Sequence, residues 1–518
     1  MSENFSRSTR LHKAAVSGRG GVVAAQNQRA ADIGAGVLRQ GGNAVDAAIA
    51  TSFALGTLEP WMSGLGGGGI MVVYLAKERK VQVVDFTLVA PQGLDPATYA
   101  LAKDGSASDL FGWPLVVEDR NVKGPHSIAV PGQVAGMELA LKTFGSWSWS
   151  QVLAPAIEQA DRGIMVDWFS TLKVTAAARD FAGQPTTRAT YLPDGFPLTP
   201  DMNNRPQRIK LGNLPQTLRR LASAGARDYY EGDIAKALVK DLKAAGSTIG
   251  LEDLRRYRAG IVDPLTFDYG ATTIHATPGL TAGPTLQQAM QRIKGRLGGK
   301  APDGAAFLAI AEAIMAANAD RFATMGDSKA TTCTSHLNVV DAAGNMVALT
   351  QTLLSLFGSR VMLPETGIMM NNGIMWFDPR PGRPNSVAAG KRPLCNMCPI
   401  VATRAGEGWF ALGASGGRRI LPAVLQLAAF LADYGMDLET AFHQPRIDVS
   451  GTEGITGDQG LAEAVVQYLG GKHKTVLAPR TADPLMFACP SAVLRDAASG
   501  LAQGIAEVTA PWAGAAAA

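Results

Sequence analysis

The chain has 518 residues, of which 47% are hydrophobic and 18% charged, so it has ample material for a globular core. Its formal net charge of +4 is small for this length, and no dense Lys/Arg run points to nucleic acid. Four cysteines are too few for a disulfide framework, no apolar run is long enough to span a membrane, and the polar N-terminus shows no secretory signal. We therefore expect a cytoplasmic protein without nucleic-acid or membrane partners.

The first hundred residues predict strands that alternate with apolar helices. Asn43 follows a Gly-Gly break and is a plausible helix cap. A glycine-rich stretch, 63–69, leads into an apolar strand suited to burial on both faces. The predicted elements are a strand at 21–25, helices at 27–38 and 44–55, a strand at 70–75 and its hairpin partner at 81–86.

The middle of the chain is mostly helical in pattern, and strands return after residue 334. The clearest predicted helices are 133–143, 149–162, 214–224, 233–245 and 305–325. The later strands are 336–341, 346–352, 361–363, 368–370, 400–403 and 409–413, followed by a helix at 420–434. The alanine tail 515–518 predicts no element. Periodicity by itself supports a mixed α/β (α+β) class, and this order suits two antiparallel sheets covered by helices.

The stretch 331–341, Thr-Thr-Cys-Thr-Ser-His-Leu-Asn-Val-Val-Asp, follows a breaker cluster at 326–328. If the bond before Thr334 were cut, its hydroxyl and a new α-amine would sit on one residue. The amine would then be a built-in base for a hydroxyl nucleophile. An ordinary loop or edge strand is the alternative that these residues alone leave open.

Several blocks, in order along the chain, resemble the γ-glutamyltranspeptidase family. The segment Thr334-Ser335-His336, with Val339-Val340-Asp341 and Gly344-Asn345, is similar to the start of the family's small subunit. The other blocks are Gly41-Gly42-Asn43-Ala44-Val45-Asp46, the glycine-rich stretch 63–69, Val130-Pro131-Gly132, Lys391-Arg392-Pro393-Leu394 and Gly416-Gly417.

The resemblance implies a four-layer αββα sandwich of the N-terminal-nucleophile hydrolase type. It implies self-cleavage between Cys333 and Thr334 into a large chain 1–333 and a small chain 334–518 that stay associated. Thr334 would be the nucleophile, Thr352 would donate to its hydroxyl oxygen, and the N–H groups of Gly416 and Gly417 would form the oxyanion hole. No cofactor or metal is expected. Whether such heterodimers pair further is left open.

A serine nucleophile is the main rival to Thr334. Gly413-Ala414-Ser415-Gly416-Gly417 fits G-x-S-x-G between a predicted strand and a helix, as in an α/β-hydrolase elbow. Four downstream residues could complete a triad: Asp433, Asp437, His443 and His473. We favour the threonine because the elbow would come very late in the chain and would leave the Thr334 block unexplained.

Three further motifs favour structural roles. The stretch 63–69 lacks the Gly-Lys-Ser/Thr of a nucleotide loop, so close backbone packing is the better interpretation. The pair Cys395 and Cys398 has no second pair beside it, which favours packing cysteines over a redox or zinc site. His336 is expected to be a hydrogen-bonded strand residue.

The chain departs from the family pattern where a γ-glutamyl substrate would be held. Thr87 replaces the arginine for the α-carboxylate, and Leu354 replaces an asparagine. Residues 373–376 are apolar where the family has acidic and amide groups, and Cys395-Asn396 replaces a Ser-Ser pair. Unpaired substrate charges in such a site would cost several kcal/mol, so a γ-glutamyl substrate is disfavoured.

The combination most resembles the oxamate amidohydrolases of purine catabolism, which convert oxamate into oxalate and ammonia. Arg360 and Arg418 are candidates for holding a carboxylate, and each is equally suited to a structural ion pair; Asn372 and Thr87 complete the expected substrate site. The alternatives are a γ-glutamyltransferase or glutathione hydrolase, an acylase acting on cephalosporin-type amides, and an inactive binding relative.

Overall fold

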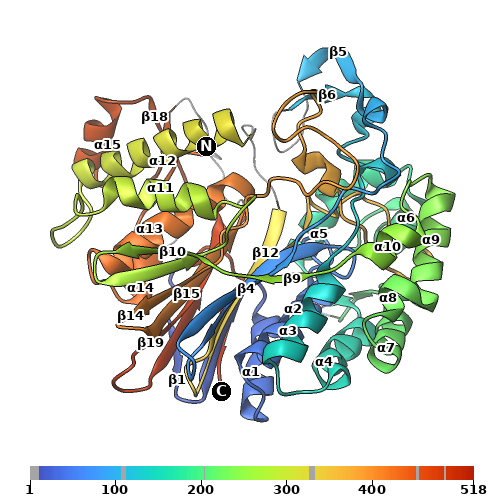
Figure 1. Ribbon diagram of the computed structural model, residues 1–518, viewed down its shortest axis with the longest axis horizontal. Coiled ribbons are helices and arrows are strands. Elements are labelled where there is room, and N and C mark those ends of the chain that lie inside the picture. Colours follow the sequence, from blue (N-terminus) through green and yellow to red (C-terminus); the bar gives the residue numbers. More distant parts are fainter. Residues whose placement is uncertain (1–10, 107–112, 204, 326–332, 451–453, 484–485) are drawn as a thin grey trace.

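The computed structural model describes residues 11–106, 113–203, 205–325, 333–450, 454–483 and 486–518. Within these residues, two seven-stranded sheets, antiparallel throughout, lie face to face in the middle of the molecule. Helices cover the outer face of each sheet (Figure 1). This arrangement confirms the expected αββα sandwich.

The two sheets draw their strands from both ends of the chain. The first sheet has the order β21 (Gly514–Ala517), β2 (Gly21–Ala25), β12 (Cys333–Asp341), β13 (Met346–Leu354), β3 (Gly68–Leu75), β4 (Lys80–Phe86) and β9 (Gly260–Val262). The second has the order β1 (Val16–Gly18), β20 (Ala502–Ala506), β19 (Cys489–Arg495), β15 (Glu407–Ser415), β14 (Ile400–Arg404), β11 (Thr272–Ala276) and β10 (Leu265–Tyr269). Shorter pairings join β5 (Leu101–Ser106) to β6 (Pro114–Val116), β7 (Ile164–Met165) to β8 (Arg208–Ile209), and β17 (Ile455–Asp458) to β16 (Ile447–Asp448) and β18 (Thr475–Ala478).

The helices form the two outer layers. The first sheet is covered by α1 (Gln28–Arg39), α2 (Ala44–Leu58), α3 (Gln133–Phe144) and α4 (Trp149–Arg162), with α5 (Trp168–Ala177), α6 (Pro185–Tyr191), α7 (Leu214–Ala224), α8 (Asp228–Glu231), α9 (Asp233–Ala245) and α10 (Leu251–Arg256) beyond them. The second is covered by α11 (Gly283–Ile293), α12 (Gly304–Thr324) and α13 (Ile420–Ala432), with α14 (Leu438–His443) and α15 (Glu463–Gly470) nearby. Among the described residues, no helix is both long and apolar enough to cross a membrane.

Strand β3 shows how the layers share one core. Its residues Ile70, Val72 and Tyr74 belong to the apolar cluster between the sheets, while Met71 and Val73 pack with the helices. Successive side chains of a strand point to opposite faces, so a strand buried on both faces must be apolar throughout. The uninterrupted apolar run predicted this burial correctly.

Most predicted elements are confirmed, and so is the predicted helix cap. Asn43 Oδ1 accepts the N–H groups of Val45 and Asp46, and the Asp46 carboxylate accepts the Asn43 N–H, forming a capping box. The structure confirms the strands at 21–25, 70–75, 81–86, 400–403 and 409–413, the hairpin at 336–352 and the helices listed above, with ends that differ by a few residues.

Three predictions were wrong or incomplete. The segments 361–363 and 368–370 are not strands, because they meet only in an isolated bridge between Met362 and Met369. Strands β10 and β11 were not predicted within the helical middle. The alanine tail is not featureless: β21 pairs with β2, with Ala515 opposite Ala24. Alanine has little strand propensity of its own, so the open edge of β2 determines this strand.

The glycine-rich stretch is a site of close backbone packing. A Cβ added to Gly66, Gly67 or Gly69 would lie 2.2 Å from Met369 O, 2.4 Å from Thr352 O or 2.3 Å from Thr350 O. Real Cβ atoms do not come so close to backbone atoms. The glycines let β3 and the chain before it lie directly against β13, as expected.

We predict that Gly67→Ala destabilises the protein by about 1–3 kcal/mol, because the added methyl would have to push β13 away. At Gly183 a Cβ would meet nothing within 4 Å. Gly183→Ala is therefore the matched control, with an expected change below about 1 kcal/mol. Urea unfolding of the two variants measures both values, and equal stabilities would contradict this account of the stretch.

Candidate active site

Thr334 lies near the start of β12, in the centre of the first sheet, and is 2% exposed. Strand β12 is paired with β2 on one side and β13 on the other. Cys333 pairs with Leu354 and Ser335 pairs with Gln351, so the register shifts at the residue between them. Two residues of β13 therefore stand opposite Thr334 alone. Bulges of this kind re-aim a side chain and are common beside active sites.

Thr352 is one of those two residues of β13, and it is fully buried. Its Oγ1 accepts the backbone N–H of Leu354 at 2.7 Å. In this bond the hydroxyl oxygen is the acceptor. The register thus brings the two predicted catalytic threonines to facing positions on neighbouring strands.

The loop after β13 holds an unusual backbone. Three non-glycine residues have positive φ, the last residue of β13 and two in the loop: Leu354 at 89°, Phe357 at 58° and Arg360 at 65°. Such conformations are costly for side chains with a Cβ and persist only where the surroundings enforce them. The strain is concentrated directly after Thr352.

Gly416 and Gly417 follow β15, the strand of the second sheet that packs on β12 and β13. Their φ angles are +131° and +63°, and a Cβ on Gly416 would lie 3.0 Å from Ala488 Cα. Both positions therefore favour glycine. A short 3₁₀ turn, Gly417–Arg419, leads into α13, so the N–H groups here begin a helical segment, where negative charge is favoured.

Ser415 does not have the partners of an elbow nucleophile. It is fully buried, and its Oγ has no hydrogen-bond partner among the described residues. The four proposed partners are engaged elsewhere: Asp433 with Tyr269, Asp437 with the Thr440 N–H, His443 with Glu439 O and the Lys13 N–H, and His473 with Glu312. No triad is assembled around this serine.

His336 has the structural role that was expected. Its ring nitrogens bond to Thr350 Oγ1 at 2.9 Å and Asn338 Oδ1 at 3.2 Å, and its ring packs against Gly413 of the second sheet. Burial lowers the pKa of His336 to about 3. The imidazole is therefore neutral at physiological pH and packs between the sheets.

Two of the residues expected to bind substrate, Thr87 and Asn372, are hydrogen-bonded to other parts of the protein. Thr87 Oγ1 donates to the Asp85 carboxylate at 2.7 Å and accepts from Arg392 Nη1 at 2.7 Å. Asn372 Nδ2 donates to Val122 O at 2.7 Å. These bonds hold the two side chains in place.

Arg360 has the contacts of a structural residue. Its Nε forms an ion pair with Asp180 at 3.2 Å, and its Nη1 donates to Ser355 Oγ at 3.0 Å and Gly358 O at 2.6 Å. Asn372 also donates to Ser355 Oγ, so the two predicted residues meet there. The paired carboxylate favours the structural interpretation of Arg360.

Arg418 directly follows the two glycines and is 6% exposed. Its guanidinium lies 5.1 Å from the ring centroid of Phe322, at the end of α12. The neighbouring Arg321 donates to Thr281 O at 2.7 Å and Cys395 O at 2.8 Å. The end of α12 thus contacts Arg418 through Phe322 and holds the segment at Cys395 through Arg321.

Asn396 and Trp376 were identified in the sequence only as departures from the family. Asn396 Oδ1 accepts from Arg321 Nη2 at 3.0 Å, which orients the amide. Asn396 Nδ2 and Trp376 Nε1 are buried and have no hydrogen-bond partner among the described residues. The Asn385 side chain joins Trp376 O at 2.7 Å to the Leu394 N–H at 3.1 Å, so the two segments adjoin.

The cysteine pair is compatible with packing. Cys395 and Cys398 are both buried and form no disulfide. Burial raises the pKa of Cys398 to about 12, so its thiol is protonated at neutral pH. Within the described part of the chain, no group of three or more His, Cys, Asp or Glu side chains could hold a metal ion.

Comparison with solved structures identifies the fold. A cephalosporin acylase from Bacillus halodurans superimposes with a TM-score of 0.87 at 23% identity, covering 100% of this chain and 99% of the acylase chain. At this identity, the likeness concerns the fold alone.

Comparison of sequences identifies relatives along nearly the whole chain. The acylase ACY 1 proenzyme of Pseudomonas sp. (strain SE83) is 34% identical over 514 residues, which cover 91% of this chain and 90% of the relative. The glutathione hydrolase proenzyme of Bacillus subtilis (strain 168) is 29% identical over 522 residues, which cover 89% and 86%.

The family model described as gamma-glutamyltranspeptidase matches residues 30–333 and 328–516, two stretches that meet just before Thr334. The chain therefore belongs to the gamma-glutamyltranspeptidase family and is an amide-hydrolysing enzyme of that family.

Proposed function

We propose that the chain cuts itself between Cys333 and Thr334 and that Thr334 is the nucleophile of the mature enzyme. The large chain, 1–333, and the small chain, 334–518, would remain together as one sandwich. The observation that carries the proposal is the position of Thr334 at the start of β12, facing Thr352 across a bulge. Among the described residues, the rival Ser415 has no hydrogen-bond partner that could activate it.

In the proposed reaction, Thr334 Oγ attacks the amide carbon, and the α-amine of the same residue takes the hydroxyl proton. Thr352 donates a hydrogen bond to Oγ, and the N–H groups of Gly416 and Gly417 stabilise the oxyanion. The C–N bond breaks as the amine gives the proton to the leaving ammonia. Water then attacks the ester carbon, frees the acid and returns the proton to Thr334 Oγ.

We predict that the purified protein runs as two chains on a denaturing gel, with Thr334 as the first residue of the smaller one. Thr334→Ala should remain a single inactive chain. Ser415→Ala is the matched control: it should mature and stay active, because the serine hydroxyl makes no hydrogen bond to any part of the chain that the structure describes. A different N-terminus, or an active Thr334→Ala together with a dead Ser415→Ala, would overturn the assignment.

We also predict the direction of the pH dependence. The α-amine must be neutral to accept the proton, so kcat/KM should fall as the pH drops through the amine's pKa, about 8 or lower. His336 should not contribute, because its pKa of about 3 keeps it neutral above pH 5. Rates of the processed enzyme between pH 5 and 9 test this. A flat profile would contradict the amine as base.

For the substrate, we propose oxamate, a two-carbon amide with an adjacent carboxylate. Two buried N–H groups near the proposed site have no hydrogen-bond partner among the described residues and could donate to a substrate: Asn396 Nδ2 and Trp376 Nε1. Oxamate presents carbonyl and carboxylate oxygens, which need donors. The candidate cations for its carboxylate are Arg418, which directly follows Gly417, and Arg360, which pairs with Asp180.

The same positions disfavour a γ-glutamyl group. Its α-ammonium needs an acceptor, whereas Leu354 and Trp376 are buried in an apolar cluster. Burying an ammonium without a partner costs several kcal/mol.

An acylase acting on larger amides is the second candidate. It is favoured by the relative named acylase, at 34% identity over nearly the whole chain. The apolar cluster of Leu354, Met375 and Trp376 would suit a less polar acyl group.

We predict that kcat/KM for oxamate exceeds that for a γ-glutamyl anilide by about 10³-fold, because several charged hydrogen bonds worth roughly 1.5–3 kcal/mol each are missing for the latter. Ammonia and aniline release by the processed enzyme, with a cephalosporin-type amide as a third substrate, measure this. Comparable turnover of the first two, or no turnover of oxamate, would reject oxamate. Preferential turnover of the third would establish the acylase.

Trp376→Phe provides a finer test, because it removes the indole N–H while keeping a smaller aromatic ring at this position. It should raise KM for oxamate about tenfold. Trp149→Phe, which loses an indole bond to Leu221 O in the helical layer, is the matched control and should leave KM unchanged.

A further inference from the structure

A buried polar network lies directly behind the start of β12. Its five side chains are each at most 2% exposed: Ser52, Ser63, Gln133, Ser335 and Gln351. They come from α2, the segment after it, the start of α3, β12 and β13. Burying polar groups is costly unless they bond to one another, so the hydrogen bonds among these side chains fix the elements that they join.

Gln351 is the centre of the network. Its Nε2 donates to Ser63 Oγ at 2.9 Å and Ser52 O at 3.1 Å. Its Oε1 accepts from Ser52 Oγ at 2.5 Å and Gln133 Nε2 at 2.6 Å. Ser63 Oγ in turn donates to Ser335 Oγ at 3.2 Å. Each bond fixes the direction of the next, and the last one ends on the residue after Thr334.

The network lies on the outer face of the first sheet, which faces the helices and not the second sheet. Ser335 and Gln351 are a cross-strand pair whose side chains reach the helices. The next pair, His336 and Thr350, bonds between the sheets. Because strand side chains alternate, holding Ser335 from behind fixes the rotation of the strand at Thr334.

Backbone bonds from the same part of the large chain support this arrangement. Leu353 N donates to Met62 O at 2.9 Å, and Phe357 N donates to Trp61 O at 2.8 Å. The segment that carries Ser63 is therefore fastened to β13 on both sides of the strained backbone at Leu354.

We propose that this network is a positioning device that holds the new N-terminus after cleavage. The inference rests on the proposed function. In the cut protein, Ser52, Ser63 and Gln133 would belong to the large chain, and Ser335 and Gln351 to the small one. A strand that begins at a chain end frays easily. The Ser63–Ser335 bond secures the small chain one residue beyond the nucleophile, while Gln351 secures the strand beside it.

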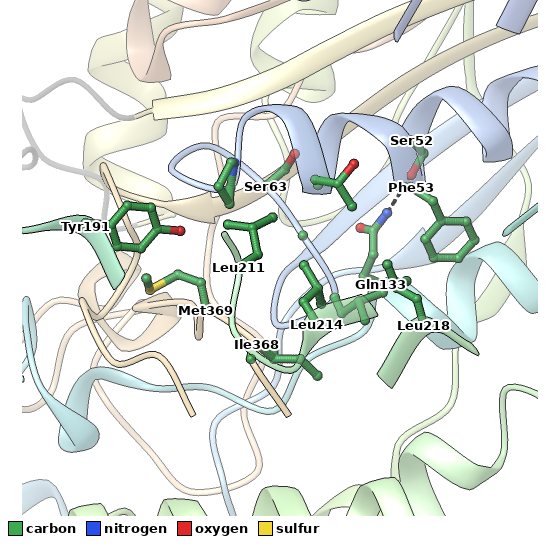
Figure 2. Close-up of a pocket in the computed structure, with 16 residues that line it drawn as sticks. Ser52, Phe53, Ser63, Gln133, Tyr191, Leu211, Leu214, Leu218, Ile368 and Met369 are labelled. Atoms are coloured by element: carbon green, nitrogen blue, oxygen red, sulfur yellow. Dashed lines mark hydrogen bonds between the residues drawn. The ribbon is translucent and has the colours of Figure 1, made fainter. Parts of the chain in front are cut away.

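A small cavity beside the network allows a sharp test. Figure 2 shows Ser63 and the Ser52–Gln133 pair at its polar side, with Leu211, Leu214, Ile368 and Met369 at the apolar side. The volume in which the centre of a water molecule can lie is about 20 Å³, so the cavity has room for one water molecule. Since Ser63 lines this cavity, Ser63→Thr can keep the hydroxyl and place its methyl there.

The test compares Ser63→Ala, Ser63→Thr and Gln351→Leu with Tyr269→Phe. The last variant is the matched control, because it loses a buried bond to Asp433 in the second sheet, away from the network. For each protein, a denaturing gel shows whether the chain is cleaved, and hydrogen exchange measures how fast the backbone amides of peptide 334–341 exchange. Steady-state kinetics with the preferred amide give kcat and KM.

We expect processed Ser63→Ala to show about tenfold faster exchange at the start of the small chain and a kcat lowered about 10- to 100-fold, because small misplacements of a nucleophile are costly. KM should stay within about twofold, Ser63→Thr should restore both readouts, and Tyr269→Phe should change neither. Gln351→Leu should have the larger effect if it folds.

Processed Ser63→Ala with wild-type exchange and kcat would overturn the proposal, and so would equal losses in Tyr269→Phe. Failure of the underlying function is visible separately, because the unmutated protein would then show no cleavage before Thr334.

Discussion

The register between β12 and β13 is the constraint on which the rest of the site depends. The side chains of one cross-strand pair, His336 and Thr350, bond to each other in the layer between the two sheets. The side chains of the next pair, Ser335 and Gln351, point to the other face and bond to residues of the helical layer. A slip of one residue would exchange the two faces and place polar groups against apolar ones. The bulge then places Thr334 opposite two residues of β13. Correct pairing of one hairpin thus determines where the Thr334 hydroxyl lies.

The polar atoms left without partners are informative because the interior otherwise satisfies so many of its polar groups. Ser415 Oγ, Asn396 Nδ2 and Trp376 Nε1 have none among the described residues. An unsatisfied hydroxyl can remain near apolar atoms at modest cost, whereas two N–H donors at positions that line the family's substrate site invite an acceptor. In the proposed substrate site, donors suited to oxygen atoms would thus stand where a γ-glutamyl enzyme would bind an ammonium.

Much of this could be predicted from the sequence, and the failures have physical reasons. The Asn43 cap, the apolar run of β3 and the hairpin around Thr334 carry local signals, and each was confirmed. Strand β21 could not be predicted, because alanine forms a strand here only through the edge of β2. The polar network was missed for a similar reason: Ser63, Gln351 and Gln133 are far apart in sequence. The ion pair of Arg360 could not be predicted either, because its partner Asp180 lies far away in the sequence.

The strand order has a consequence for how such an enzyme can assemble. With a cut before Thr334, the first sheet would read, from β21 to β9, small, large, small, small, large, large, large. Strand β2 of the large chain would be hydrogen-bonded on both sides to the small chain, and the second sheet would be mixed as well. Two chains interleaved in this way cannot dock as finished bodies or trade partners with another molecule without opening a sheet. If the proposed cut is made, the precursor is the folding unit, and each large chain stays paired with the small chain cut from the same precursor.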